Sequence, residues 1–162
     1  MDLKVFSGRA NVELAQAIGR ELPTPSDAPC IARSFPDGEP RVQIPENVRG
    51  ADVFLIQPTN QRLVTMAHTP GDPVGSNFEE LLAMVNAAVL ASAGSITAVI
   101  PYFGGARSDR KTEPRMPITA QAMCIALEAV GANRLLTVDL HAGQITGFFR
   151  GGSFDNLEAL PV

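Results

Sequence analysis

The sequence predicts an α/β fold with a mainly parallel sheet and helices on both faces of that sheet. Short, continuous apolar runs, typical of buried parallel strands, alternate along the chain with helical patterns. Glycines and polar residues follow several of these runs directly, where ligands of open α/β sheets bind. The 162 residues, 45% of them hydrophobic, suffice for one domain with a buried core. We therefore expect a single domain over residues 1–162.

The N-terminal part of the chain predicts a strand, a helix and a hairpin. Residues 3–6 form an apolar strand run, and a helix follows over residues 12–18 and ends before Pro23. Residues 31–35 and 41–44 have the composition of strands, and the Pro-Asp-Gly-Glu-Pro spacer between them has that of a turn.

The middle of the chain predicts a long helix between two buried strands. The strands are the apolar runs at residues 53–56 and 96–100. The helix covers residues 77–93, with Ser76 as its N-cap and Gly94 as its stop.

The C-terminal part of the chain predicts one further helix and one further strand. The helix covers residues 119–130 and is closed by Gly131, and the strand at residues 135–138 is the last clear one. The segments 151–153 and 158–162 indicate a connection that leads elsewhere.

Composition and charge argue against several classes of protein. No apolar run approaches the roughly 20 residues that span a bilayer, and the N-terminus lacks the apolar core of a signal peptide, so we expect a cytoplasmic protein with no membrane partner. A net charge of −4, a single tyrosine and no tryptophan argue against a nucleic-acid binder. Cys30 and Cys124 have no CxxC neighbour, and we expect two buried free thiols.

A glycine-rich and basic segment follows the strand at residues 96–100. From Arg107 to Arg115 there are four cations and two anions, so the segment carries a charge of +2 in an acidic chain. The planar guanidinium group of arginine can donate two parallel hydrogen bonds to the oxygens of one phosphate. This composition therefore favours an anionic small ligand, most simply a phosphate. A solvated, salt-bridged loop is the alternative interpretation.

Two further segments carry residues suited to nucleotide chemistry. In the turn at residues 35–39, Phe35 can stack on a base while Asp37 and Glu39 accept hydrogen bonds from its exocyclic amine, although such turns are also ordinary hairpin connections. Asp139 and His141 follow a buried strand and can face a Mg²⁺ that bridges nucleotide phosphates, although a histidine beside a strand is often structural. Neither GxxxxGK[ST] nor GxGxxG occurs in the chain.

Taken together, these segments resemble the N-terminal half of the ribose-phosphate pyrophosphokinase (phosphoribosyl pyrophosphate synthetase) family. The matching blocks occur in family order and cover nearly the whole chain: FSGRA at 6–10, ELA at 13–15, FPDGE at 35–39, VQIPENVRG at 42–50, AGSITAVIPYFG at 93–104, ARSDRK at 106–111, LTVDLHA at 136–142, QI at 144–145 and GFF at 147–149. This combination is far more specific than any one block.

The resemblance implies a phosphoribosyltransferase-like fold and a Mg²⁺-dependent reaction. The family transfers the β,γ-diphosphoryl group of ATP to the 1-hydroxyl of ribose 5-phosphate, which gives phosphoribosyl pyrophosphate and AMP, and it assembles as dimers that build toward hexamers. The implied ATP contacts are Phe35, Asp37 and Glu39, which reach into a neighbouring subunit's site, and Arg107, Ser108 and Asp109 in the basic segment. The implied Mg²⁺ site is Asp139 with His141, and Asp155 is a further candidate.

The chain departs from the family pattern at several positions. Pro36 replaces the usual Ser, Ser108 replaces a Gln that contacts ATP, and Arg150 replaces an Asp of many members. The loop at residues 61–75 is longer than usual and predicts an extended surface segment. The family's second half, which binds ribose 5-phosphate and holds the transferring phosphates, is absent, so we expect no catalytic residue and no activity in these 162 residues alone.

Three classes of function remain open at this point. The chain can be the N-terminal domain of an active synthetase, a non-catalytic relative resembling the synthetase-associated proteins, or a nucleotide-binding module without a reaction of its own. Asp37, Glu39, Arg107 and His141 together favour the active synthetase, whereas Ser108 and Arg150 favour the non-catalytic relative.

Overall fold

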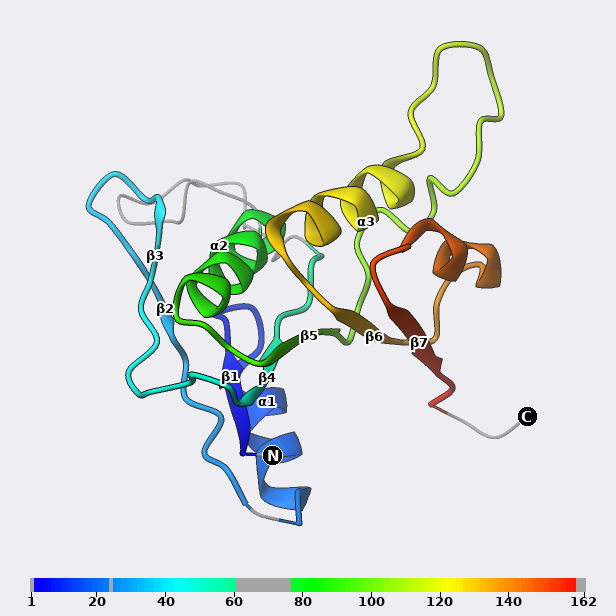
Figure 1. Ribbon diagram of the computed structural model, residues 1–162. Helices are drawn as coiled ribbons and strands as arrows, with labels where there is room; N and C mark the ends of the chain where they lie inside the picture. The colour runs from blue at the N-terminus through cyan, green and yellow to red at the C-terminus, as the bar shows by residue number, and fades with distance from the viewer. Residues whose placement is uncertain (1, 24, 61–76, 160–162) are drawn as a thin grey trace.

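The computed structural model describes residues 2–23, 25–60 and 77–159, and its centre is a five-stranded sheet (Figure 1). The strands lie in the order β1 (Leu3–Ser7), β4 (Asp52–Ile56), β5 (Ser95–Ile100), β6 (Arg134–Val138) and β7 (Ser153–Leu157). All four neighbouring pairs are parallel. The predicted fold class is confirmed.

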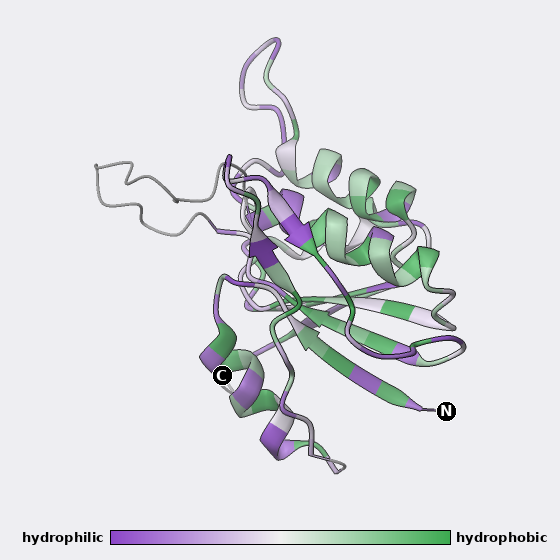
Figure 2. Cartoon of the chain, turned by 90° about the vertical axis from the view of Figure 1, so that its left-hand side faces the viewer, coloured by the Kyte–Doolittle hydropathy of each residue, from purple (hydrophilic) through white to green (hydrophobic). Residues whose placement is uncertain are grey.

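Helices cover both faces of this sheet, as expected. Helices α2 (Asn77–Leu90) and α3 (Thr119–Val130) lie side by side on one face, where they enclose the main core with β4, β5 and β6. Helix α1 (Val12–Glu21) packs on the other face over a smaller apolar cluster. Figure 2 shows hydrophobic residues concentrated in the strands and in the two paired helices.

Strands β2 (Ala32–Ser34) and β3 (Pro40–Val42) form the predicted hairpin beside α2. At its tip the backbone N–H of Phe35 donates to the carbonyl of Glu39 over 2.9 Å. Gly38 adopts a φ of +93° there, a conformation that favours glycine. The tip therefore projects as a tight turn.

The end of α2 differs from its prediction. The helix stops at Leu90, and Ser92 rather than Gly94 adopts the left-handed conformation, with a φ of +61°. Gly94 serves close packing instead, because a Cβ at this position would lie 2.7 Å from the carbonyl oxygen of Gly50. Gly131, by contrast, closes α3 in the left-handed conformation as predicted. Ser76 and the loop at residues 61–75 lie outside the described residues.

Strand β7 was not predicted, because only Phe154 of its five residues is partly buried. Its backbone pairs with β6 from Arg134 to Val138, and the 3₁₀ helix η1 (Gly143–Phe148) precedes it.

The expectation of two buried thiols is half wrong, since Cys124 is buried but Cys30 is exposed. None of the helices in the described part of the chain has the length and hydrophobicity of a membrane-spanning segment.

Candidate functional site

A cavity of about 430 Å³ opens at the carboxyl ends of β5 and β6. Its lining combines the turn after β5 with the turn after β6: Tyr102, Phe103, Gly105, Ala106, Arg107, Ser108, Val138, Asp139, Leu140 and His141. The structure thus brings together four of the predicted site residues, two from each turn. The volume lies in the range of small-molecule sites, about 300–1,000 Å³.

The turn after β5 is fixed by Thr59, which follows β4. The Thr59 side-chain oxygen accepts a hydrogen bond from the N–H of Gly104 over 2.8 Å and donates to the carbonyl of Tyr102 over 3.3 Å. A Cβ on Gly104 would lie 2.6 Å from the Thr59 carbonyl oxygen, so only glycine permits this approach. Sequence reasoning did not identify Thr59, although its place three residues after a buried strand is a usable signal.

Ser108 connects the beginning of the basic segment to the residues at the start of α3. Its hydroxyl accepts a hydrogen bond from the N–H of Thr119 over 3.3 Å and donates to the carbonyl of Pro117 over 3.2 Å. Its carbonyl accepts from the N–H of Ala120 over 3.2 Å. Ser108 therefore satisfies two backbone donors of the first turn of α3, a function of N-cap residues.

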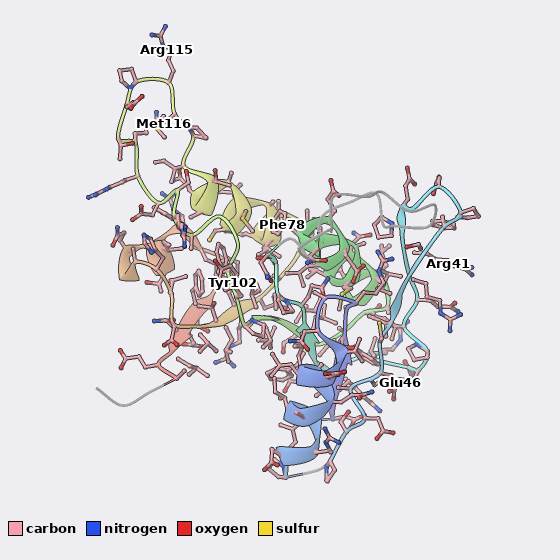
Figure 3. The ribbon with its side chains drawn as sticks, turned by 180° about the vertical axis from the view of Figure 1, so that it is seen from behind. Arg41, Glu46, Phe78, Tyr102, Arg115 and Met116 are labelled. Atoms are coloured by element: carbon pink, nitrogen blue, oxygen red, sulfur yellow. The ribbon has the colours of Figure 1, made fainter. Side chains whose placement is uncertain are left out.

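Beyond Ser108 the segment projects from the body of the domain as a long loop (Figure 1). Arg115 and Met116 lie on this projecting loop, away from Tyr102, which lines the cavity (Figure 3). Asp109 accepts a hydrogen bond from the side-chain amide of Gln144 in η1, so it ties the loop to the neighbouring turn instead of lining the cavity. Arg107 is exposed and forms no ion pair with the described residues.

The turn after β6 holds Asp139 with a φ of +48°, a left-handed conformation that aspartate tolerates better than most residues. The end of β7 fixes this turn. The N–H of Asp139 donates to the carbonyl of Leu157 over 2.9 Å, and Asp139 Oδ1 accepts from the N–H of Ala159 over 3.0 Å. Oδ2 forms no hydrogen bond with the described residues, and His141 is exposed beside it on the cavity wall.

The three residues expected at the metal do not converge. Asp155 lies within β7 opposite Leu136, and its carboxylate is 3.9 Å from the guanidinium of Arg134. Within the described ranges no group of three or more His, Cys, Asp or Glu side chains is placed to hold a metal. Mg²⁺ in nucleotide sites keeps several waters and takes one or two protein carboxylates beside the phosphates, so Asp139 with its free oxygen fits this kind of ion, with His141 next to it.

Phe35, Asp37 and Glu39 lie on the hairpin and not on the cavity wall. Phe35 is 45% exposed, and both carboxylates are exposed as well. Asp37 Oδ1 accepts from the N–H of Glu39 over 3.1 Å, which stabilises the turn. Within one chain, the hairpin trio and the cavity therefore do not meet.

An ion pair that sequence reasoning missed ties the hairpin to the domain. Arg9 Nε lies 2.5 Å from Glu80 Oε2, and the Arg9 guanidinium also donates to the hydroxyl of Ser34 in β2. Glu80 Oε1 accepts from the N–H of Arg9 over 2.6 Å and from Gln57 Nε2 over 2.9 Å. Glu80 is only 2% exposed, so its charge depends on these donors.

Comparison with known proteins identifies relatives along almost the entire chain. The family model of the N-terminal domain of ribose phosphate pyrophosphokinase matches residues 3–131. The ribose-phosphate pyrophosphokinase of Rhodopirellula baltica is 48% identical over 161 residues, which are 99% of this chain and 47% of the relative. That of Campylobacter jejuni is 50% identical over 146 residues, which are 90% of this chain and 43% of the relative.

A solved crystal structure also matches almost the whole chain, over about half of its own length. The crystal structure of phosphoribosylpyrophosphate synthetase from Mycobacterium smegmatis matches with a TM-score of 0.81 at 36% sequence identity, over 98% of this chain and 49% of that chain. The chain thus spans about half the length of the proteins that it matches.

Proposed function

Because the chain belongs to the ribose-phosphate pyrophosphokinase family and corresponds to its N-terminal domain, we propose that it supplies the ATP-binding part of an enzyme that makes phosphoribosyl pyrophosphate. In this reaction the 1-hydroxyl oxygen of ribose 5-phosphate forms a bond to the β-phosphorus of ATP, and the bond from that phosphorus to the α,β-bridging oxygen breaks, so that AMP leaves. The observation that supports this proposal most is that Arg107, Asp139 and His141 line the same cavity.

Within the cavity each side chain has a distinct task. Arg107 has no ion-pair partner among the described residues, so its fork of N–H donors is free to bind phosphate oxygens. Ser108 and Asp109 act mainly by holding the segment that positions Arg107, through their contacts to α3 and η1. Asp139 and His141 would hold Mg²⁺, which when bound neutralises charge on the ATP phosphates.

The hairpin serves a different subunit in this proposal. Phe35 would stack on the adenine of a neighbouring subunit's ATP, while Asp37 and Glu39 accept hydrogen bonds from its amine. Their exposure at a projecting tip, away from the chain's own cavity, supports a contact with a neighbouring subunit, which would belong to an assembly of dimers that build toward hexamers. Asp155 has no role in this proposal, because it lies within β7 beside Arg134.

Ribose 5-phosphate would bind through a second domain that these 162 residues do not include. Positioning of two reactants contributes about 7–11 kcal/mol to lowering a barrier, so the domain alone is expected to give no measurable turnover. The experiment is to follow AMP formation from MgATP and ribose 5-phosphate with this chain and with a chain extended through the second domain. Only the extended chain should be active.

In the extended chain, Arg107→Ala and His141→Ala should each lower kcat about 10²–10³-fold, the usual effect of removing one group that stabilises charge in a transition state. Arg110→Ala is a matched control, because Arg110 is exposed in the same loop but does not line the cavity. Phosphoribosyl pyrophosphate synthesis by the isolated chain would contradict the proposal. An extended chain that stays inactive would instead indicate a non-catalytic relative.

A further inference from the structure

Two arginines face each other across the β2–β3 hairpin. Arg33 and Arg41 are direct partners in the antiparallel register, so their side chains leave the same face of the hairpin. Directly opposite residues in such a pair have Cβ atoms about 4.5–5.5 Å apart, and like charges at this separation destabilise the pairing. A negative charge between the two side chains would offset this repulsion.

The described residues provide no such charge. Both arginines are exposed, and neither forms an ion pair with a carboxylate of the described ranges. Arg41 is nevertheless held in position, because its guanidinium carbon lies 5.8 Å from the centre of the Phe35 ring. Figure 3 shows Arg41 on the outer side of the hairpin, pointing away from the sheet.

The two arginines also line a cavity of about 310 Å³ together with Cys30, Ile31, Gln43 and Pro45. Arg33, Arg41 and the side-chain amide of Gln43 are hydrogen-bond donors, and the lining contains no carboxylate. This cavity shares no lining residue with the one that contains Arg107. The hairpin cavity thus has two cationic donors, one from each strand, whereas Arg107 is the only arginine or lysine among the described residues that lines the other cavity.

We propose that this face of the hairpin is a binding site for a phosphate dianion, held between Arg33 and Arg41. Two guanidinium groups can each direct N–H donors at one phosphate, and the bound charge removes the repulsion between the strands. The site lies on the hairpin that carries Phe35, so the bound phosphate stabilises the position of that ring. The proposal rests on the register and the cavity, and it does not depend on the proposed function.

The test follows the arginine side-chain N–H signals of the ¹⁵N-labelled 162-residue chain by NMR during titration with inorganic phosphate at constant ionic strength. The signals of Arg33 and Arg41 should shift in a saturable way. Arg33→Gln and Arg41→Gln should each weaken phosphate binding about tenfold, as expected when one hydrogen-bonded charge is removed. Arg107→Gln is the control, because it removes a cation from the other cavity and should leave the hairpin response unchanged.

A parallel titration with ribose 5-phosphate separates two sources of the same chemistry. Equal responses indicate a site for free phosphate, and a stronger response to the sugar phosphate indicates a site for phosphomonoesters. Signals that do not saturate with either compound, or that keep their response in both glutamine variants, would overturn the proposal. Because the readout requires no catalysis, it stands or fails separately from the ATP reaction.

Discussion

Replacing Arg9 by methionine should destabilise the domain by about 3 kcal/mol. The change keeps an unbranched side chain but removes the guanidinium from Glu80, which is 2% exposed. Breaking a buried ion pair on one side costs about 3–5 kcal/mol, because the remaining charge is left without its partner. Glu80 Oε1 keeps its donors from the Arg9 N–H and from Gln57, whereas Oε2 loses the Arg9 side chain, so the lower end applies.

Urea unfolding followed by circular dichroism measures this loss, and a thermal scan should show a decrease in Tm of about 6–12 °C for a chain of this size. Arg134→Gln is the matched control: it removes an exposed pair with Asp155 at 3.9 Å and should cost about 0–1 kcal/mol. The double variant Arg9→Met, Glu80→Met should recover much of the stability, since no buried charge remains.

Hydrogen exchange gives a second readout for the same variant. Because Arg9 also contacts Ser34, the amide protons of Phe35 and Gly38 should exchange faster in Arg9→Met than in the control. A loss below 1 kcal/mol in Arg9→Met, together with unchanged exchange at the hairpin, would refute the assignment of this ion pair as the tether of the hairpin.

Three further predictions concern single side chains. Ser7→Ala should leave stability unchanged or raise it by up to about 1 kcal/mol in urea unfolding, since the buried Ser7 hydroxyl has no hydrogen-bond partner among the described residues; a clear loss would contradict this. With a thiol reagent at pH 9, Cys30 should react quickly and Cys124 only after unfolding, because burial raises the pKa of Cys124 to about 12; two fast thiols would contradict this. Ser108→Ala should cost about 1 kcal/mol in urea unfolding by removing the acceptor of the Thr119 N–H, whereas Ser108→Thr should retain most of the stability, and equal losses would contradict the capping role.

The sequence predicted the parallel sheet and its helices because the buried strands are continuous apolar runs such as the one at residues 96–100. Strand β7 gave no such signal, since backbone pairing with β6 and not side-chain burial defines it. The turn residues Arg107 and Asp139 were predicted to lie at strand ends, and their common cavity follows from the adjacency of β5 and β6.

The side-chain contacts that hold the hairpin and the basic segment in place could not be predicted from the sequence, because they join residues that lie far apart in the chain. Glu80 lies 71 residues from Arg9, and Gln144 lies 35 residues from Asp109. No local pattern connects such pairs, because each depends on how distant elements pack. Asp155, the further candidate for the metal site, lies within the unpredicted strand β7 beside Arg134.

The Asp139 turn depends on residues that are made about twenty positions after it, Leu157 and Ala159. Chains grow from the N-terminus, and strands β1, β4, β5 and β6 are made by residue 138, whereas Ile145 and Phe149 of the main core follow it. The hydrogen bonds that hold the Asp139 turn come from Leu157 and Ala159, which emerge about twenty residues later. The cavity beside Asp139 therefore takes its described shape only when β7, the last described strand, has paired with β6.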